Sequence, residues 1–237
     1  MIPKIIHYCW FGRGQIPQLA LDCIASWHKF MPDWTFIEWN EDNFDINSLT
    51  YVKEAYEARK YAFVSDYVRL YALFNYGGLY MDVDFEVFKP FDNLLEHQAF
   101  AGYEGSKYSP VMMGVLASEQ KGDWIAKQME LYAGRHFVKS DGSYDMTTNV
   151  AFLTKHMMEQ GLVCDGNEKD FDGLHIFPVD YFCPRQTTGE YFRTDNTYCD
   201  HKGLNSWSSS KDKPLLLKLV GEKNSIRLIK IKRKIFG

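Results

Sequence analysis

Two aspartates, Asp82 and Asp84, lie one residue apart directly after the apolar residues 79–81. Side chains alternate along a strand, so a strand over residues 79–85 would place both carboxylates on the same face. Two carboxylates make a hard, anionic oxygen site, which suits Mn²⁺ or Mg²⁺ together with the oxygens of a bound phosphate. We therefore expect a divalent metal site at the carboxyl end of this strand, where open α/β sheets bind ligands.

A second pair of charged residues precedes the aspartates. Asp66 and Arg69 are three positions apart, so on a helix they share one face. Their neighbours are mostly apolar, which predicts a largely buried helix, and a buried acid or arginine needs a partner. An ordinary ion pair is the alternative interpretation of these two residues, as a solvated turn is for the aspartate pair.

The elements that must position these residues follow from the apolar pattern. Strand-like runs and helical spacings alternate, which predicts an α/β fold with a mixed, mainly parallel central sheet flanked by helices. The expected strands cover residues 4–10, 35–39, 79–85, 99–103 and 111–116, and the expected helices cover residues 17–30, 51–75, 124–132 and 149–160. The longest helix should break near Lys60 and Tyr61 and end at Gly77 and Gly78, since glycine is favoured just after a helix. His7, inside the first apolar run, is expected to be a core histidine.

The composition limits the possible classes of protein. A chain of 237 residues with 46% hydrophobic residues can bury one sizeable core. With 31 acidic and 27 basic residues, the net charge of −4 provides no global positive field for nucleic acid. The five cysteines form no close pair, and no stretch approaches the ~20 apolar residues of a membrane span. We therefore expect a cytoplasmic protein with reduced cysteines.

The block over residues 61–90 resembles the DXD-containing sugar transferases of glycosyltransferase family 32. The family's pattern is an A-x-x-SD-x-x-R helix followed by Y-GG-x-Y and D-x-D, matched here by Ala62, Ser65, Asp66, Arg69, Tyr76, Gly77, Gly78, Tyr80, Asp82 and Asp84. The opening IPKIIHYCWFG is similar to the family's first strand, and HKGLNSW is similar to its C-terminal element at His201, Ser206 and Trp207. The three motifs occur in the family's order and span nearly the whole chain.

This resemblance implies a GT-A fold over residues 1–210 and a retaining transfer of a hexose or N-acetylhexosamine from a nucleotide-diphosphate sugar. It favours a UDP-linked donor over GDP-mannose, with Mn²⁺ or Mg²⁺ as the cofactor. The implied catalytic residues are Asp82, Asp84 and Arg69, and the implied metal ligands are Asp84, Asp82 and His201. The implied donor contacts are Trp10, stacked on the base, with Asp66, Arg69, Asp82, Ser206 and Trp207.

The acceptor implied by the resemblance is a saccharide, which we expect to be a lipid-linked unit of a growing capsule or O-antigen. Asn149, Tyr103 and Glu104 are the residues that we expect to contact it. The family often carries a Thr-Gly-Pro element near residue 148, and its Gly-Pro is absent here. For Thr148 and Asn149, a helix N-cap is the alternative role.

The last part of the chain, residues 211–237, is a basic tail in which bulky apolar residues alternate with lysines and arginines. Such a segment can lie on an anionic membrane surface, so we expect the protein to be peripheral on the inner face of the cell membrane. A solvated tail or a final strand is the alternative.

Two other functions would use the same aspartates. In a glycoside hydrolase, Asp82 and Asp84 would be the acid and the nucleophile, but neighbours on one strand face leave no room for a substrate between them. In a divalent-metal sugar-binding protein they would bind Ca²⁺, which needs more oxygen ligands than this motif offers.

Overall fold

A seven-stranded mixed sheet lies at the centre of the fold, in the order β2-β1-β3-β6-β5-β8-β7. The computed structural model describes residues 1–105, 110–184 and 191–204, and the sheet is built from these. Its strands are β1 (Ile5–Cys9), β2 (Thr35–Trp39), β3 (Gly78–Met81), β5 (Ala99–Tyr103), β6 (Val111–Ser118), β7 (Lys169–Phe171) and β8 (Leu174–Phe177). The pairings show that β1, β2, β3, β5 and β8 run in one direction, and β6 and β7 in the other. The predicted mixed sheet with mainly parallel strands is confirmed.

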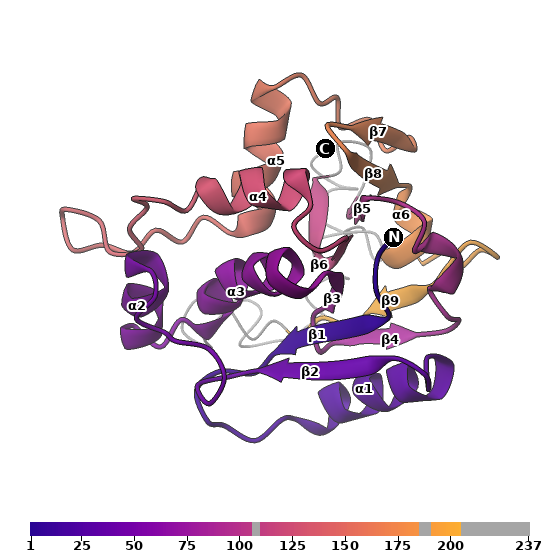
Figure 1. Cartoon of the computed structure of the whole chain (residues 1–237), viewed down its shortest axis with the longest axis horizontal. Helices are drawn as coiled ribbons and strands as arrows, with labels where there is room; N and C mark the ends of the chain where they lie inside the picture. Colours follow the sequence, from indigo (N-terminus) through magenta and orange to yellow (C-terminus); the bar gives the residue numbers. More distant parts are fainter. Residues whose placement is uncertain (106–109, 185–190, 205–237) are drawn as a thin grey trace, which may run out of the picture. The chain divides into compact units, whose positions relative to one another are not determined.

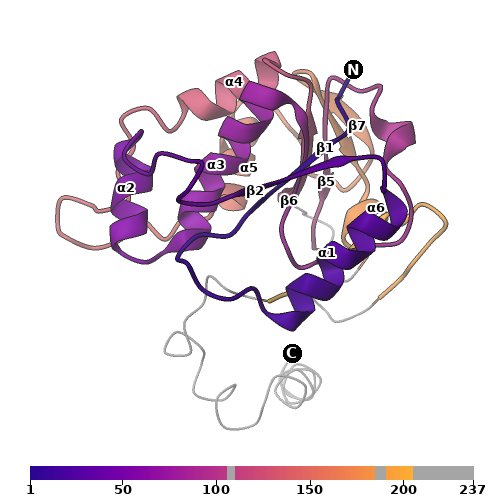
Figure 2. The ribbon, with the colours of Figure 1, turned by 60° about the horizontal axis from the view of Figure 1, so that its bottom comes forward.

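Helices cover both faces of this sheet (Figures 1 and 2). The helices of the described residues are α1 (Gln18–Phe30), α2 (Thr50–Glu57), α3 (Tyr61–Tyr76), α4 (Asp123–Glu130), α5 (Asn149–Glu159), α6 (Val179–Phe182) and a 3₁₀ turn at Asp92–Leu94. One core cluster lies between the sheet and α2, α3, α4 and α5, and the other lies between the sheet, α1 and α6. The predicted α/β class is therefore confirmed. Within the described ranges, no helix is long and apolar enough to cross a membrane.

A separate antiparallel ribbon joins β4 (Phe85–Val87) to β9 (Cys199–His201). It corrects the predicted strand over residues 79–85, because β3 ends at Met81 and the next residues turn, closed by a hydrogen bond from Phe85 N to Asp82 O of 3.2 Å. The turn lets Phe85 leave the main sheet, pair with β9 and bury its ring in the core. Asp82 and Asp84 consequently lie in a turn and do not share one face of a strand.

The chain enters β3 through two glycines that end α3. Gly77 and Gly78 have φ values of 66° and 111°, which L side chains rarely adopt. A Cβ on Gly78 would also lie 2.5 Å from Ile5 O, so the close approach of β1 and β3 requires glycine there. The predicted helix end is confirmed, as is the predicted break, since α2 and α3 are separated by residues 58–60.

His7, on the neighbouring strand β1, forms a hydrogen bond with the glycine turn at residues 77–78. Its Nε2 donates to Gly77 O over 2.8 Å, and its Nδ1 accepts from Trp39 Nε1 over 3.1 Å. Burial lowers the pKa of His7 to about 4, so the ring is neutral and bonded through both nitrogens. The prediction of a core histidine is confirmed, and the glycine turn that leads into β3 is bonded to β1.

Candidate active site

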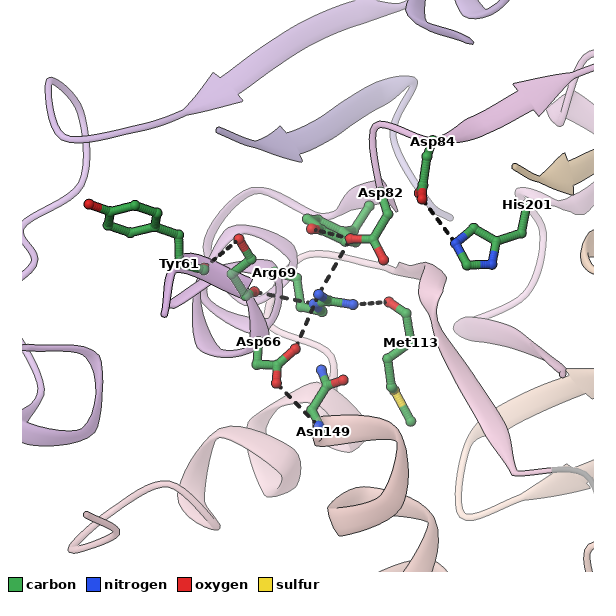
Figure 3. Close-up of polar contacts among 10 residues, drawn as sticks. Tyr61, Asp66, Arg69, Asp82, Asp84, Met113, Asn149 and His201 are labelled. Carbon is green, nitrogen blue, oxygen red and sulfur yellow. Dashed lines mark hydrogen bonds and ion pairs between the residues drawn. The ribbon is translucent and has the colours of Figure 1, made fainter. Parts of the chain in front are cut away.

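Arg69 is a buried cation between two carboxylates (Figure 3). Its Nη2 lies 3.2 Å from Asp66 Oδ1 and 3.4 Å from Asp82 Oδ1. Nη1 donates to Met113 O over 2.6 Å, Nε donates to Ser65 O over 3.2 Å, and the guanidinium lies over the Tyr80 ring. The predicted shared helix face of positions 66 and 69 is confirmed, and both charges have partners.

The two carboxylates around Arg69 differ in exposure. Asp66 is 7% exposed and accepts from the backbone N–H of Asn149 over 3.2 Å, and burial raises its pKa to about 6 although Arg69 opposes this. The side chain of Asp82 is 35% exposed, and its Oδ1 accepts from Tyr80 OH over 2.7 Å. Asp82 is therefore the more accessible of the two carboxylates, and Arg69 and the Tyr80 hydroxyl hold it in place.

Asp84 faces a different partner, His201 of β9. Asp84 Oδ2 lies 3.1 Å from His201 Nε2 and accepts from Leu204 N over 2.8 Å. Although burial opposes both shifts, this contact lowers the pKa of Asp84 and raises the pKa of His201. The ring of His201 stacks on Phe85 at 4.7 Å between centroids, so the β4–β9 pairing orients the imidazole.

The side chains around Asp82 and Asp84 provide some, but not all, of the ligands that the predicted cation would need. Among the described residues, no group of three or more His, Cys, Asp or Glu side chains could hold a metal ion by itself. Mg²⁺, and by the same chemistry Mn²⁺, is commonly bound by one or two carboxylates together with substrate phosphates and water. Asp84, His201 and the partly exposed Asp82 could supply such a partial set. Asp82 and Asp84 lie in the turn between β3 and β4, and His201 meets Asp84 from β9, which pairs with β4.

The remaining predicted contacts have different outcomes. Trp10 is partly exposed in the loop after β1, where its Nε1 donates to Gly14 O over 2.7 Å. Burial raises the pKa of Glu104, and His201, Asp82 and Arg69 are among the charges that act on it, so Glu104 lies near the site. Ser206, Trp207 and the tail over residues 211–237 fall outside the described residues.

Tyr103 corrects our acceptor prediction. It is 0% exposed and packs in the core cluster beneath α5, so an acceptor cannot reach it. The physical reason is that β5 is an interior strand covered on both faces, where every residue is buried. Asn149, which is 2% exposed, begins α5, and Thr148 caps the helix by accepting from Ala151 N over 3.4 Å. The N-cap alternative is confirmed for Thr148.

Three participants were missed by the sequence reasoning: the Tyr80 hydroxyl, the carbonyl of Met113 and the bare Cα of Gly114. Tyr80 belongs to the Y-GG-x-Y motif, so its hydroxyl could have been predicted to donate a hydrogen bond near Asp82. The two residues of β6 gave no local signal, because their role depends on which strand pairs with β3.

Comparison with known proteins agrees with this geometry. Residues 17–101, which contain Asp66, Arg69, Asp82 and Asp84, match the family described as a glycosyltransferase sugar-binding region containing a DXD motif. This segment of the chain is therefore similar to the sugar-binding region of that family. The mixed sheet between two layers of helices is in keeping with the α/β fold that the resemblance implied.

The chain is similar to two yeast proteins over less than half of its length. It is 31% identical over 106 residues to inositol phosphoceramide mannosyltransferase 1 of Schizosaccharomyces pombe, covering 42% of this chain and 33% of that protein. It is 31% identical over 108 residues to mannosyl phosphorylinositol ceramide synthase CSH1 of Saccharomyces cerevisiae, covering 42% and 27%. The matched region therefore spans a third or less of these relatives.

Two solved structures share a broader but more distant likeness. The PaToxG glycosyltransferase aligns with a TM-score of 0.47 and 18% identity, over 67% of this chain and 72% of that one. A glycosyltransferase involved in the glycosylation of the major capsid of PBCV-1 aligns with a TM-score of 0.48 and 11% identity, over 84% and 94%.

Proposed function

We propose that the protein is a metal-dependent glycosyltransferase that moves a hexose or N-acetylhexosamine from a nucleotide-diphosphate sugar to a saccharide acceptor, with retention of configuration. The observation that carries this proposal is the buried Arg69 between Asp66 and Asp82, beside the Asp84–His201 pair. All of these except His201 lie in the segment that matches the sugar-binding region.

The roles of the residues follow from their exposure and partners. Asp84 and His201 would hold the cation, and Asp82 would reach it directly or through water while contacting the ribose. The cation would neutralise charge on the leaving diphosphate. Arg69 is 5% exposed and each of its three nitrogens has a protein partner, so its main role would be to orient Asp66 and Asp82. Asp66 would then face the donor sugar.

A retaining transfer needs either a nucleophilic carboxylate or attack from the face of the leaving group. Asp82 and Asp84 are already bonded to Tyr80, Arg69 and His201, and we assign neither as a nucleophile. We therefore propose front-face attack, in which a donor phosphate oxygen accepts the proton of the incoming hydroxyl. The family match favours transfer over hydrolysis, and a Ca²⁺-binding role would need about six to eight oxygens around the cation.

The donor and the acceptor are the finer parts of the proposal. The family resemblance favours a UDP-linked sugar, whereas the yeast relatives are named for mannosyl transfer to inositol phosphoceramide, which makes mannose the second candidate. A lipid-linked saccharide, such as a capsule or O-antigen unit, would be the acceptor. Contact of residues 211–237 with the inner face of the membrane would bring the enzyme to it.

A nucleotide-release assay over a panel of UDP- and GDP-linked sugars tests this function. We expect release from one donor in Mn²⁺ or Mg²⁺, loss of release in EDTA, and retention of anomeric configuration in the product. No release from any donor with either metal, for a protein that is folded and monodisperse, would reject the proposal. Release from GDP-mannose alone would replace the UDP-linked donor and keep the rest.

A further inference from the structure

Strand β6 passes directly beneath the turn that carries the two aspartates. Its residue Gly114 accepts a hydrogen bond from Asp82 N through its carbonyl, over 2.8 Å. The neighbouring carbonyl, that of Met113, accepts from Arg69 Nη1 over 2.6 Å. Two successive residues of one strand therefore hold Arg69 and the start of the turn.

Gly114 also leaves space that a side chain would fill. A Cβ at this position would lie 2.8 Å from Asp82 Oδ2 and 2.8 Å from Phe85 Cε2. Real Cβ atoms essentially never approach other atoms so closely, so any L side chain would press on both groups, and both the carboxylate and the ring would have to shift. Gly114 is not among the glycines with positive φ, so the constraint is the missing side chain and not the backbone conformation.

The two groups that a side chain at position 114 would strike belong to different parts of the site. Asp82 Oδ2 is part of the carboxylate that Tyr80 and Arg69 orient through Oδ1. The Phe85 ring stacks on the imidazole of His201, which in turn bonds Asp84. Phe85 is 1% exposed and packed in the core, whereas the Asp82 side chain is 35% exposed, so Asp82 would move further and the strain against Phe85 would remain.

We propose that Gly114 is a positioning residue of the active site, whose bare Cα allows the Asp82 carboxylate and the Phe85–His201 stack to occupy their places together. The proposal rests on the proposed function for its catalytic consequence, but not for its geometry. Replacement by alanine would rotate Asp82 away from Tyr80 and Arg69 while leaving β6 paired. The donor and the cation would then meet a displaced carboxylate.

Gly114→Ala is the test, with Gly122→Ala as the matched control. Gly122 has a φ of −59°, lies beyond the carboxyl end of β6, and would place its Cβ 2.6 Å from Ser118 Oγ. Because a misplacement of about 1 Å can cost roughly 100-fold, we expect Gly114→Ala to lower kcat/KM for the donor by about 10- to 100-fold. We also expect a higher Mn²⁺ concentration for half-maximal activity, with both quantities unchanged in Gly122→Ala. Equal donor and Mn²⁺ dependence in the two variants would overturn the proposal.

A double-mutant cycle separates this inference from the enzymatic function. The loss of stability caused by Gly114→Ala should be smaller in an Asp82→Ala background, because the carboxylate that it strikes is gone. If Gly114→Ala alone does not fold, recovery of folding in that background carries the same test. An equal loss in both backgrounds contradicts the proposal. If the cycle shows coupling but the wild type releases nucleotide from no donor, the proposed function fails and the positioning by Gly114 stands.

Discussion

Replacing Arg69 by lysine should damage both the stability and the activity of the protein, because one ammonium cannot take the place of a planar fork. Arg69 is 5% exposed, and its three guanidinium nitrogens contact four groups. They donate hydrogen bonds to Ser65 O and Met113 O and form ion pairs with Asp66 and Asp82. A lysine nitrogen at one point would leave Met113 O or a carboxylate without a partner. Since each unpartnered buried acceptor costs about 1–3 kcal/mol, we expect Arg69→Lys to lower the free energy of unfolding by about 2–4 kcal/mol. Donor turnover should fall by about 100-fold, as Asp82 loses its orientation.

Chemical denaturation and single-turnover donor cleavage on the same variant measure the two effects. Arg13→Lys is the control, because Arg13 pairs with Asp42 at the surface, where the two side chains are 60% and 68% exposed. Water screens this exposed pair, so its replacement should change the free energy of unfolding very little. An Arg69→Lys variant that matches Arg13→Lys in both measurements would refute the central position of Arg69. A loss of stability with normal turnover would reduce Arg69 to a structural ion pair.

Three further predictions concern Asp84, His7 and the C-terminal tail. Asp84→Ala should abolish metal-dependent transfer while the protein stays folded, and unaltered turnover at saturating donor would exclude Asp84 as a metal ligand. Because the pKa of His7 is about 4 in the folded protein and its ordinary value is 6.5, the unfolded state binds the proton more tightly between these values. The free energy of unfolding should therefore fall by up to about 3 kcal/mol as the pH falls from 6.5 through 4, and His7→Gln should remove this slope; parallel curves would contradict it. Deletion of residues from Ser225 onward should lower sedimentation with anionic liposomes at low salt and spare donor hydrolysis, whereas equal sedimentation would reject the membrane contact.

The parts of the fold that depend on local pattern could be predicted from the sequence. The shared face of Asp66 and Arg69 follows from helical spacing, and the end of α3 follows from the conformational freedom of Gly77 and Gly78. The interior position of His7 follows from the apolar run around it. Each of these depends on residues within a few positions of each other.

Features set by distant pairing could not be predicted in this way. The end of β3 at Met81 depends on β4 leaving the sheet to pair with β9, more than 100 residues later in the chain. The burial of Tyr103 depends on the layers that cover β5 on both faces, which remove the alternation that would distinguish an exposed side chain. The contact of Asp84 with His201 was anticipated only through the family resemblance, and the role of Gly114 required the register of β3 against β6.

Titration calorimetry with nucleoside diphosphates measures whether the protein binds the leaving group of a sugar donor through a divalent cation. We predict that UDP or GDP binds the wild-type protein in Mn²⁺, that binding weakens strongly in EDTA, and that Asp84→Ala binds no better in Mn²⁺ than the wild type does in EDTA. Binding that is equally tight with and without the cation, or no binding of either nucleotide in Mn²⁺, would contradict it.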